Sequence, residues 1–410
     1  MMESPSLLAH LSEARAETDR LFTHLDPAAL YDRPIAERHR MIFYLGHLEA
    51  FDWNQMKLIG MSSSSPVAQF DNLFAFGIDP EPGQLPHDQP SDWPRLLEVE
   101  RYNRGVRSEI DRYLPNAPQE NVQMMIEHRH MHAETFAYIL HNLDASRKSG
   151  PKEQPLLTGP LVQQMMPVPA GTATLGMNQG SQFGWDNEFQ EHEAPVPPFT
   201  MTRYKITNGE FLDFMQQTGA PPPHYWLQKD GAWFYRGMFE DLPLPLSFPV
   251  YCTLDQASAY ARFRRLAIPT EAQFHRAAFG TKNQGEERAL PWQHSHSDLS
   301  QPDQGQRGNL NYAAWNPIPV NASPDTESAF GIAQLVGNGW EWTSTVFAPF
   351  PGFAPSATYP GYSANFFDNA HYVLKGASPR TSSTLVRRSL RNWFRPEYPY
   401  VYATFHLVQN

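Results

Sequence analysis

Residues 119–142 read QENVQMMIEHRHMHAETFAYILHN, which predicts one helix that carries His128-Arg-His-Met-His-Ala-Glu134 near its centre. His128 and His132 are four residues apart, so their imidazoles lie on one face of the helix, one turn apart. Two imidazoles at that spacing can bind one metal ion, although a histidine-rich surface helix would show the same pattern. His130 lies about 200° around the helix from His128 and should point elsewhere. Glu134 falls on a flank, where it can support the ligands from outside.

Three more helices are predicted upstream, which makes the first part of the chain a four-helix bundle. Apolar residues recur at helical spacing over 7–25 and 34–59, and a third helix is predicted over 91–113. Residues 60–91 are rich in Ser, Pro, Gly and Asp and are expected to form a long connection. Bundle cores are common places for metal sites.

A third histidine interrupts the apolar face of the helix predicted over 34–59. It is His47, in Tyr44-Leu-Gly-His-Leu. A single histidine on such a face is more often a satisfied core residue than a ligand. Facing His128 and His132 across the bundle, however, it completes a set of three imidazoles that suits Fe, Zn or Cu. Three protein ligands leave coordination positions open for chemistry, so we predict a catalytic metal centre here.

Composition argues against several other classes of function. The chain of 410 residues has a net charge of −11, which disfavours a general nucleic-acid-binding surface. Its one cysteine, Cys252, cannot form an intrachain disulfide, which fits a reducing compartment. The N-terminus lacks the pattern of a signal peptide, and no stretch is long and apolar enough to span a membrane. We expect a cytoplasmic protein that acts on small molecules, without nucleic-acid or membrane partners.

The character of the chain changes after a polar, proline-containing linker predicted at 148–159, between a bundle over 1–147 and a second domain over 160–410. In the second domain, short apolar runs alternate with Gly, Pro, Asn and Trp. Only short helices are predicted there, at 208–218, 254–266 and 271–278. We therefore expect an irregular, mixed α+β domain with much of its mass in loops.

Motifs in both parts resemble those of ergothioneine-type sulfoxide synthases. The H-x3-H-x-E run, with a third histidine on an earlier helix, is similar to the DinB-like domain of that family. The second part resembles a formylglycine-generating-enzyme-type sulfatase-modifying domain. The matching motifs, in order, are Pro167–Thr172, Trp185–Glu188 with His192, Tyr204–Phe211, Ile268–Phe274, Gly337–Thr343, Lys375–Ser378 and Arg388–Trp393.

The resemblance implies both a fold and an activity. The expected fold class is α+β, with a DinB-like four-helix bundle followed by a C-type-lectin-like, formylglycine-generating-enzyme-type domain. The expected cofactor is Fe(II), held between the two parts by His47, His128 and His132. The expected reaction uses O2 to join a chalcogen to the imidazole C2 of hercynine, a histidine betaine. Formylglycine generation is disfavoured because its cysteines lie near the C-terminus, whereas Cys252 is expected to be a small buried residue.

Departures from the family pattern indicate the chalcogen donor. Members that use γ-glutamylcysteine carry an arginine pair before the third helix, whereas residues 85–94 contain no arginine to clamp a carboxylate. Those members end this motif with Asp after Arg-Asn-Trp, and this chain has Phe394. The family's glutamine before the last histidine ligand is Met131 here, which puts one betaine contact in doubt. A neutral selenosugar, the donor of the related selenoneine synthases, is therefore expected, with a thiol as the alternative.

The resemblance also assigns candidate substrate and catalytic residues. Trp393 matches a substrate-contacting tryptophan, whose face would bind the trimethylammonium group by cation–π attraction. Phe394 would add to this surface, and Arg391 lies in the same motif. Tyr359 and Tyr362 match the region of the family's active-site tyrosines, where one would donate a proton or electron to an iron-bound oxygen species. Ordinary core or surface packing is the alternative for each of these rings.

Two other classes of function remain open. A DinB-type thiol S-transferase with Zn²⁺ at the three histidines would explain the first part and leave residues 160–410 without a role. A non-catalytic ligand-binding module would leave the histidines idle. Asn338 and Glu341 are also candidate contacts for a structural Ca²⁺.

Overall fold

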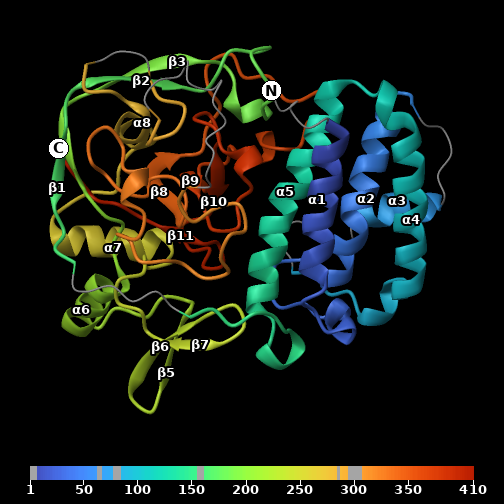
Figure 1. Cartoon of the computed structure of the whole chain (residues 1–410), viewed down its shortest axis with the longest axis horizontal. Helices are drawn as coiled ribbons and strands as arrows, with labels where there is room; N and C mark the ends of the chain where they lie inside the picture. The colour runs from blue at the N-terminus through green and yellow to red at the C-terminus, as the bar shows by residue number, and fades with distance from the viewer. Residues whose placement is uncertain (1–6, 62–66, 77–84, 155–160, 284–286, 294–306) are drawn as a thin grey trace. The chain divides into compact units, whose positions relative to one another are not determined.

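Figure 1 shows the chain as a computed structural model, described for residues 7–61, 67–76, 85–154, 161–283, 287–293 and 307–410. The chain divides into two compact units, Met1–Lys152 and Glu153–Asn410. Part of the predicted linker, 155–160, lies outside the described residues, whereas Lys148 forms a β-bridge with Leu25 of the first unit. No helix in these ranges combines the length and apolar character that a membrane span requires.

Helices build the first unit, as predicted. The long ones are α1 (Leu7–Phe22), α2 (Met41–Leu58), α4 (Leu96–Tyr113) and α5 (Gln119–Asn142). Helix α2 packs against α4 and α5, and α1 packs along α5 (Figure 1). Two predicted starts were too early: α2 begins at Met41 rather than at 34, and α4 begins at Leu96 rather than at 91. Pro94 explains the second difference, because the residue before a proline is disfavoured in the helical conformation, and Trp93 is extended.

The short helix α3 (Ala68–Phe76) was not predicted, because its residues fell within the expected connection over 60–91. An isolated helix of this length is not stable in water, so packing must hold it. Its Phe74 is fully buried against Gly46 of α2, where an added Cβ would lie 2.5 Å from the ring. Its buried Asp71 accepts a hydrogen bond of 2.9 Å from the hydroxyl of Tyr102 on α4. Tertiary contacts rather than local periodicity therefore define α3.

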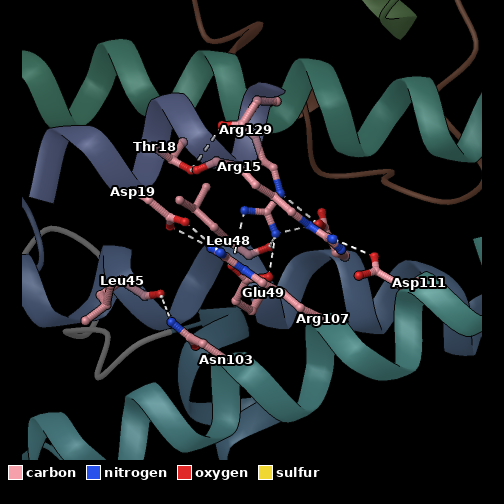
Figure 2. Close-up of polar contacts among 12 residues, drawn as sticks. Arg15, Thr18, Asp19, Leu45, Leu48, Glu49, Asn103, Arg107, Asp111 and Arg129 are labelled. Carbon is pink, nitrogen blue, oxygen red and sulfur yellow. Dashed lines mark hydrogen bonds and ion pairs between the residues drawn. The ribbon is translucent and has the colours of Figure 1, made fainter. Parts of the chain in front are cut away.

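A buried ion network connects α2, α4 and α5. The fully buried guanidinium of Arg129 on α5 donates to Glu49 and Asp52 of α2, each at 2.6 Å. Figure 2 shows Arg107 of α4 reaching the same Glu49, at 2.6 Å, and also Asp19 of α1. Burial alone would raise the pKa of Glu49, but the two arginines outweigh burial and hold this pKa at about 2. Charge-assisted hydrogen bonds thus fix the position of α5 along α2.

In the residues that the structure describes, the second unit combines several small sheets with three α-helices. Its central sheet has the order β10-β9-β8-β11. The two inner strands, β8 (Gly339–Val346) and β9 (Tyr372–Ala377), are antiparallel. The edge strands are β10 (Asn392–Phe394) and β11 (Ala403–Thr404). The other sheets are β1-β4-β12, β2-β3 and β5-β6-β7. Their strands are β1 (Met165–Val168), β2 (Gly171–Leu175), β3 (His192–Val196), β4 (Phe199–Thr202), β5 (Trp226–Lys229), β6 (Ala232–Arg236), β7 (Asp241–Pro243) and β12 (Val408–Gln409).

The helices of the second unit lie where the sequence predicted them. They are α6 (Asn208–Thr218), α7 (Leu254–Arg264) and α8 (Glu271–Phe279). Each begins with a threonine whose hydroxyl accepts from a backbone N–H three residues later, in a capping box. Helix α8 packs against both β2-β3 and the central strands β8 and β9, with Phe274 and Ala277 fully buried. The mixed α+β character predicted for this part of the chain is confirmed.

The predicted Ca²⁺ contacts are engaged by protein groups, which corrects that expectation. Glu341 is fully buried on β8, where it pairs with the ammonium of Lys205 and with His406 Nδ1 at 2.9 Å. Burial alone would raise the pKa of Glu341, but its two partners hold this pKa at about 2. Asn338 Oδ1 accepts a hydrogen bond of 2.9 Å from the backbone N–H of Ile318. These side chains stabilise the sheet and do not present open oxygen ligands.

Removing Arg129 is expected to destabilise the first unit strongly. Arg129→Ala leaves Asp52 buried without its ion-pair partner and leaves Glu49 with Arg107 alone, which should lower the free energy of unfolding by about 3–5 kcal/mol. Arg112→Ala removes an exposed pair with Glu109 and should cost less than about 1 kcal/mol. Urea unfolding followed by far-UV circular dichroism measures both losses. Equal small losses in the two variants would show that the network does not hold α5 on α2.

Candidate functional site

The three predicted metal ligands lie together in the core of the first unit. His47 comes from α2, whereas His128 and His132 come from α5. One ligand nitrogen from each ring lies within 4.8 Å of the others, and no other such group of His, Cys, Asp or Glu occurs in the described ranges. The Nε2 atoms of His47 and His132 are 3.2 Å apart. This separation suits two ligands that each lie about 2.1 Å from one metal ion.

The surroundings orient these rings. His47 Nδ1 lies 2.7 Å from the backbone oxygen of Phe74. A carbonyl can only accept, so Nδ1 carries the proton and Nε2 keeps a lone pair for a metal. The ring of Phe51 stacks on His128 at a centroid distance of 3.5 Å and an angle of 8°. The buried Nδ1 of His132 has no hydrogen-bond partner among the described residues.

Burial keeps the three imidazoles neutral. It lowers the pKa of His47 to about 4 and holds the pKa values of His128 and His132 well below the ordinary value, with a smaller contribution from the neighbouring histidines. Neutral imidazole nitrogens are the form that binds a divalent transition metal. Three of them on two packed helices fit an iron or zinc ion and leave positions open for other ligands.

The remaining candidates on α5 lie outside the three-histidine group. His130 is buried, and its electrostatic neighbours are Arg129 and His10 of α1, so it points away from the other two histidines as predicted. Glu134 is buried four residues after His130, which places it on that same face. Met131 is half-buried beside the ligand face, one residue before His132.

Three aromatic candidates of the second unit, Tyr359, Tyr362 and Trp393, lie in one cluster. Tyr362 stacks on Trp185 at 4.2 Å and 25° and meets Trp393 edge-on at 5.4 Å and 85°. Tyr359 lies 5.7 Å from Tyr362, measured between ring centroids. Phe347 stacks on Trp393 at 4.3 Å and 7°. Tyr359, Tyr362 and Trp393 are each half-buried, so this cluster, the Trp393 cluster, keeps accessible ring surface. Burial raises the pKa of Tyr359, which keeps its phenol protonated.

Phe394 belongs to a different aromatic group. Consecutive residues of a strand point to opposite faces, so Phe394 does not extend the surface of Trp393, which corrects that expectation. The ring of Phe394 stacks on Tyr398 at 5.0 Å and 13°. Tyr398 meets Tyr400 edge-on at 5.1 Å, and Tyr400 meets His224 at 4.9 Å. These four half-buried rings form a second surface, the Phe394 cluster, on the other side of β10.

Arg391, predicted to contact substrate, is held by contacts within the second unit. Its side chain is buried, and its Nε lies 3.0 Å from a carboxylate oxygen of Glu271. Its Nη1 donates to the backbone oxygens of Asn187 and Ala348, at 3.2 and 3.1 Å. The guanidinium also lies 4.0 Å from the ring centroid of Phe350. These contacts pair the guanidinium with groups of the protein itself.

Two contributors to the site were missed from the sequence. The carbonyl of Phe74 orients His47, but the pattern of residues 60–91 gave no sign of a helix there. Trp185 was noted only as part of a motif, although its ring lies against Tyr362. Neither contact has a local sequence signal, because each joins segments that lie far apart in the chain.

Comparisons with known proteins show which family the chain resembles. The family described as "Sulfatase-modifying factor enzyme 1-like domain" matches residues 152–410. Hercynine oxygenase of Mycolicibacterium thermoresistibile is 30% identical over 349 residues, which cover 76% of this chain and 74% of that protein. Hercynine oxygenase of Mycobacterium tuberculosis is 28% identical over 99% of both chains.

A longer relative matches the same chain. Ergothioneine biosynthesis protein 1 of Neurospora crassa is 25% identical over 93% of this chain and 55% of that protein, so the chain spans about half the length of this relative. The bacterial matches, in contrast, extend over most of both sequences. The chain therefore belongs to the ergothioneine sulfoxide synthase-like family, with a sulfatase-modifying-factor-type domain as its second part.

Proposed function

We propose that this protein is a non-haem iron(II) enzyme that uses O2 to join selenium from a selenosugar to the imidazole C2 of hercynine. The observation that carries the proposal is the buried, neutral group of His47, His128 and His132 in a chain of this family. The bonds C2–H and Se–H are replaced by C2–Se. If the product is the selenoxide, one atom of O2 becomes its oxygen and the other leaves as water, which balances the four electrons that O2 accepts.

Iron is preferred over zinc because of the reaction that the relatives' names describe. The bacterial relatives are hercynine oxygenases, and reduction of O2 requires a metal that changes oxidation state. Zinc does not do so, although it binds the same imidazoles. Iron, when bound by the three histidines, would supply the electron transfer to O2. The S-transferase alternative, which needs zinc, explains neither these relatives nor the second unit.

The Trp393 cluster is the proposed binding site for the trimethylammonium group of hercynine. A trimethylammonium group cannot donate hydrogen bonds, so aromatic faces are its usual protein partners. Trp393 is held between Phe347 and Tyr362 with part of its surface accessible. Tyr359 or Tyr362 would supply a proton to a developing oxygen base. Burial raises the pKa of Tyr359, so its phenol carries the proton.

Internal pairing of arginines supports a neutral donor. Arg387 donates to Glu188 at 2.7 Å, and Arg391 is held by Glu271. Both arginines would otherwise be candidates for binding a donor carboxylate, but each is already paired with a carboxylate of the protein. A charged peptide thiol left unpaired in a partly buried site would lose several kcal/mol of binding free energy. The Phe394 cluster instead offers ring faces, which pack well against a sugar. A thiol donor remains the alternative.

Loss of a metal-ligand ring should remove iron and activity together. His47→Ala, His128→Ala and His132→Ala are each expected to abolish stoichiometric iron in anaerobically purified protein. They should also abolish O2-dependent consumption of hercynine with a selenosugar, while far-UV circular dichroism stays unchanged. His130→Ala is the matched control from the same helix and should keep both iron and turnover. Loss of iron in His130→Ala, with retention in His128→Ala, would place the metal on the opposite face of α5.

Trp393→Ala is expected to weaken hercynine binding by about 1–2 kcal/mol, because a desolvated cation–π contact is lost. Calorimetric titration of the wild type should also show weaker binding of histidine, which lacks the methyl groups. The variant should bind the two ligands about equally poorly. Phe394→Leu is the control, since that ring lies on the other face of β10. Equal affinity of the wild type for hercynine and histidine would exclude Trp393 from the cation site.

A further inference from the structure

The segment Trp185–Glu188 contacts the loop that carries both candidate tyrosines. Asp186 is buried, and its Oδ1 accepts from Ser363 Oγ at 2.5 Å while its Oδ2 accepts from the backbone N–H of Ser356 at 3.3 Å. Trp185 adds the ring stack on Tyr362. Ser356 and Ser363 lie on either side of Tyr359 and Tyr362 in the sequence. The carboxylate of Asp186 therefore holds both ends of this segment, which we call the 356–363 loop.

The same segment also contacts the residues that lead into β10. Glu188 accepts hydrogen bonds of 2.7 Å from Arg387 Nε and from Ser389 Oγ. The backbone oxygen of Asn187 accepts from Arg391, at 3.2 Å. Residues 387–391 run directly into the strand that presents Trp393. This single short turn, Asp186–Glu188 (η5), therefore joins the two segments of the Trp393 cluster, which lie more than 20 residues apart in sequence.

The two carboxylates of this turn differ in their partners. Asp186 is bonded to a hydroxyl and a backbone N–H, and burial raises its pKa. Burial would also raise the pKa of Glu188, but Arg387 outweighs it and keeps this pKa below the ordinary value. Burying a carboxylate that has only neutral partners costs free energy, so packing alone does not account for Asp186. Asp186 specifies the position of the 356–363 loop through the directions of its hydrogen bonds.

We propose that Asp186 and Glu188 are positioning residues with separate tasks in the Trp393 cluster. Asp186 holds Tyr359 and Tyr362 in place for the chemical step. Glu188, through Arg387 and Ser389, holds the segment that presents Trp393 to the hercynine cation. Because one turn carries both carboxylates, it also sets the spacing between the tyrosines and the tryptophan. This inference rests on the proposed function, which assigns the tyrosines and Trp393 to hercynine.

Steady-state kinetics of the iron-loaded full chain separates the two tasks. Asp186→Ala and Ser363→Ala should lower kcat about tenfold or more, since small misplacements of reacting groups are costly, with little change in hercynine KM. Asp186→Asn keeps an acceptor for Ser363 and should recover much of kcat. Ser389→Ala should raise hercynine KM and leave kcat nearly unchanged. Ser383→Ala, an exposed hydroxyl bonded to Asn311, is the matched control and should change neither parameter.

Hydrogen-exchange mass spectrometry tests the same assignment without turnover. Ser363→Ala should speed exchange in the 356–363 loop and leave residues 387–394 unchanged, while Ser389→Ala should do the converse. Equal effects of both variants on kcat and KM, or exchange that rises in both segments together, would reduce η5 to a general packing element and overturn the inference. If the wild type does not consume hercynine but the exchange patterns separate, the proposed function fails, and only the separate attachment of the two segments to η5 stands.

Discussion

A buried guanidinium between two carboxylates is the interaction on which the metal site depends. Arg129 follows His128 directly on α5. On α2, its partners Glu49 and Asp52 lie two and five residues after His47. The ion network therefore fixes the axial position of α5 against α2 within one turn of the three ligands. A slip of one residue would rotate His128 and His132 by about 100° away from His47. The carbonyl of Phe74 then sets the remaining freedom, the orientation of the His47 ring.

The second unit uses an edge strand to separate two chemical surfaces. Because β10 alternates its side chains, Trp393 and Phe394 enter different aromatic clusters although they are neighbours in sequence. The Trp393 cluster contains phenol groups beside an indole, which suits a cation and a proton transfer. The Phe394 cluster contains stacked rings and a histidine, whose faces can pack against an uncharged partner such as a sugar. Buried ion pairs such as Lys205–Glu341 hold the central sheet that carries both.

Local patterns predicted much of this structure, and contacts between distant segments account for what they missed. The four-residue spacing of His128 and His132, and the position of His47 on an apolar face, were enough to predict the group that the structure brings together. Helix α3 was missed because Phe74 is held by Gly46 rather than by its own neighbours in sequence. Arg391 was assigned to substrate from its motif, and its pairing with Glu271 could not be foreseen because the two residues lie 120 positions apart. The separation of Phe394 from Trp393 required the recognition of β10 as a strand.

The donor is the most specific part of the proposed function, and a competition assay tests it most directly. Iron-loaded protein is given hercynine, O2 and equimolar selenosugar and γ-glutamylcysteine, and the products are identified by mass spectrometry. A product with a carbon–selenium bond, in large excess over any sulfur product, is the predicted result. A predominant sulfur product would contradict the account and restore a thiol as the donor.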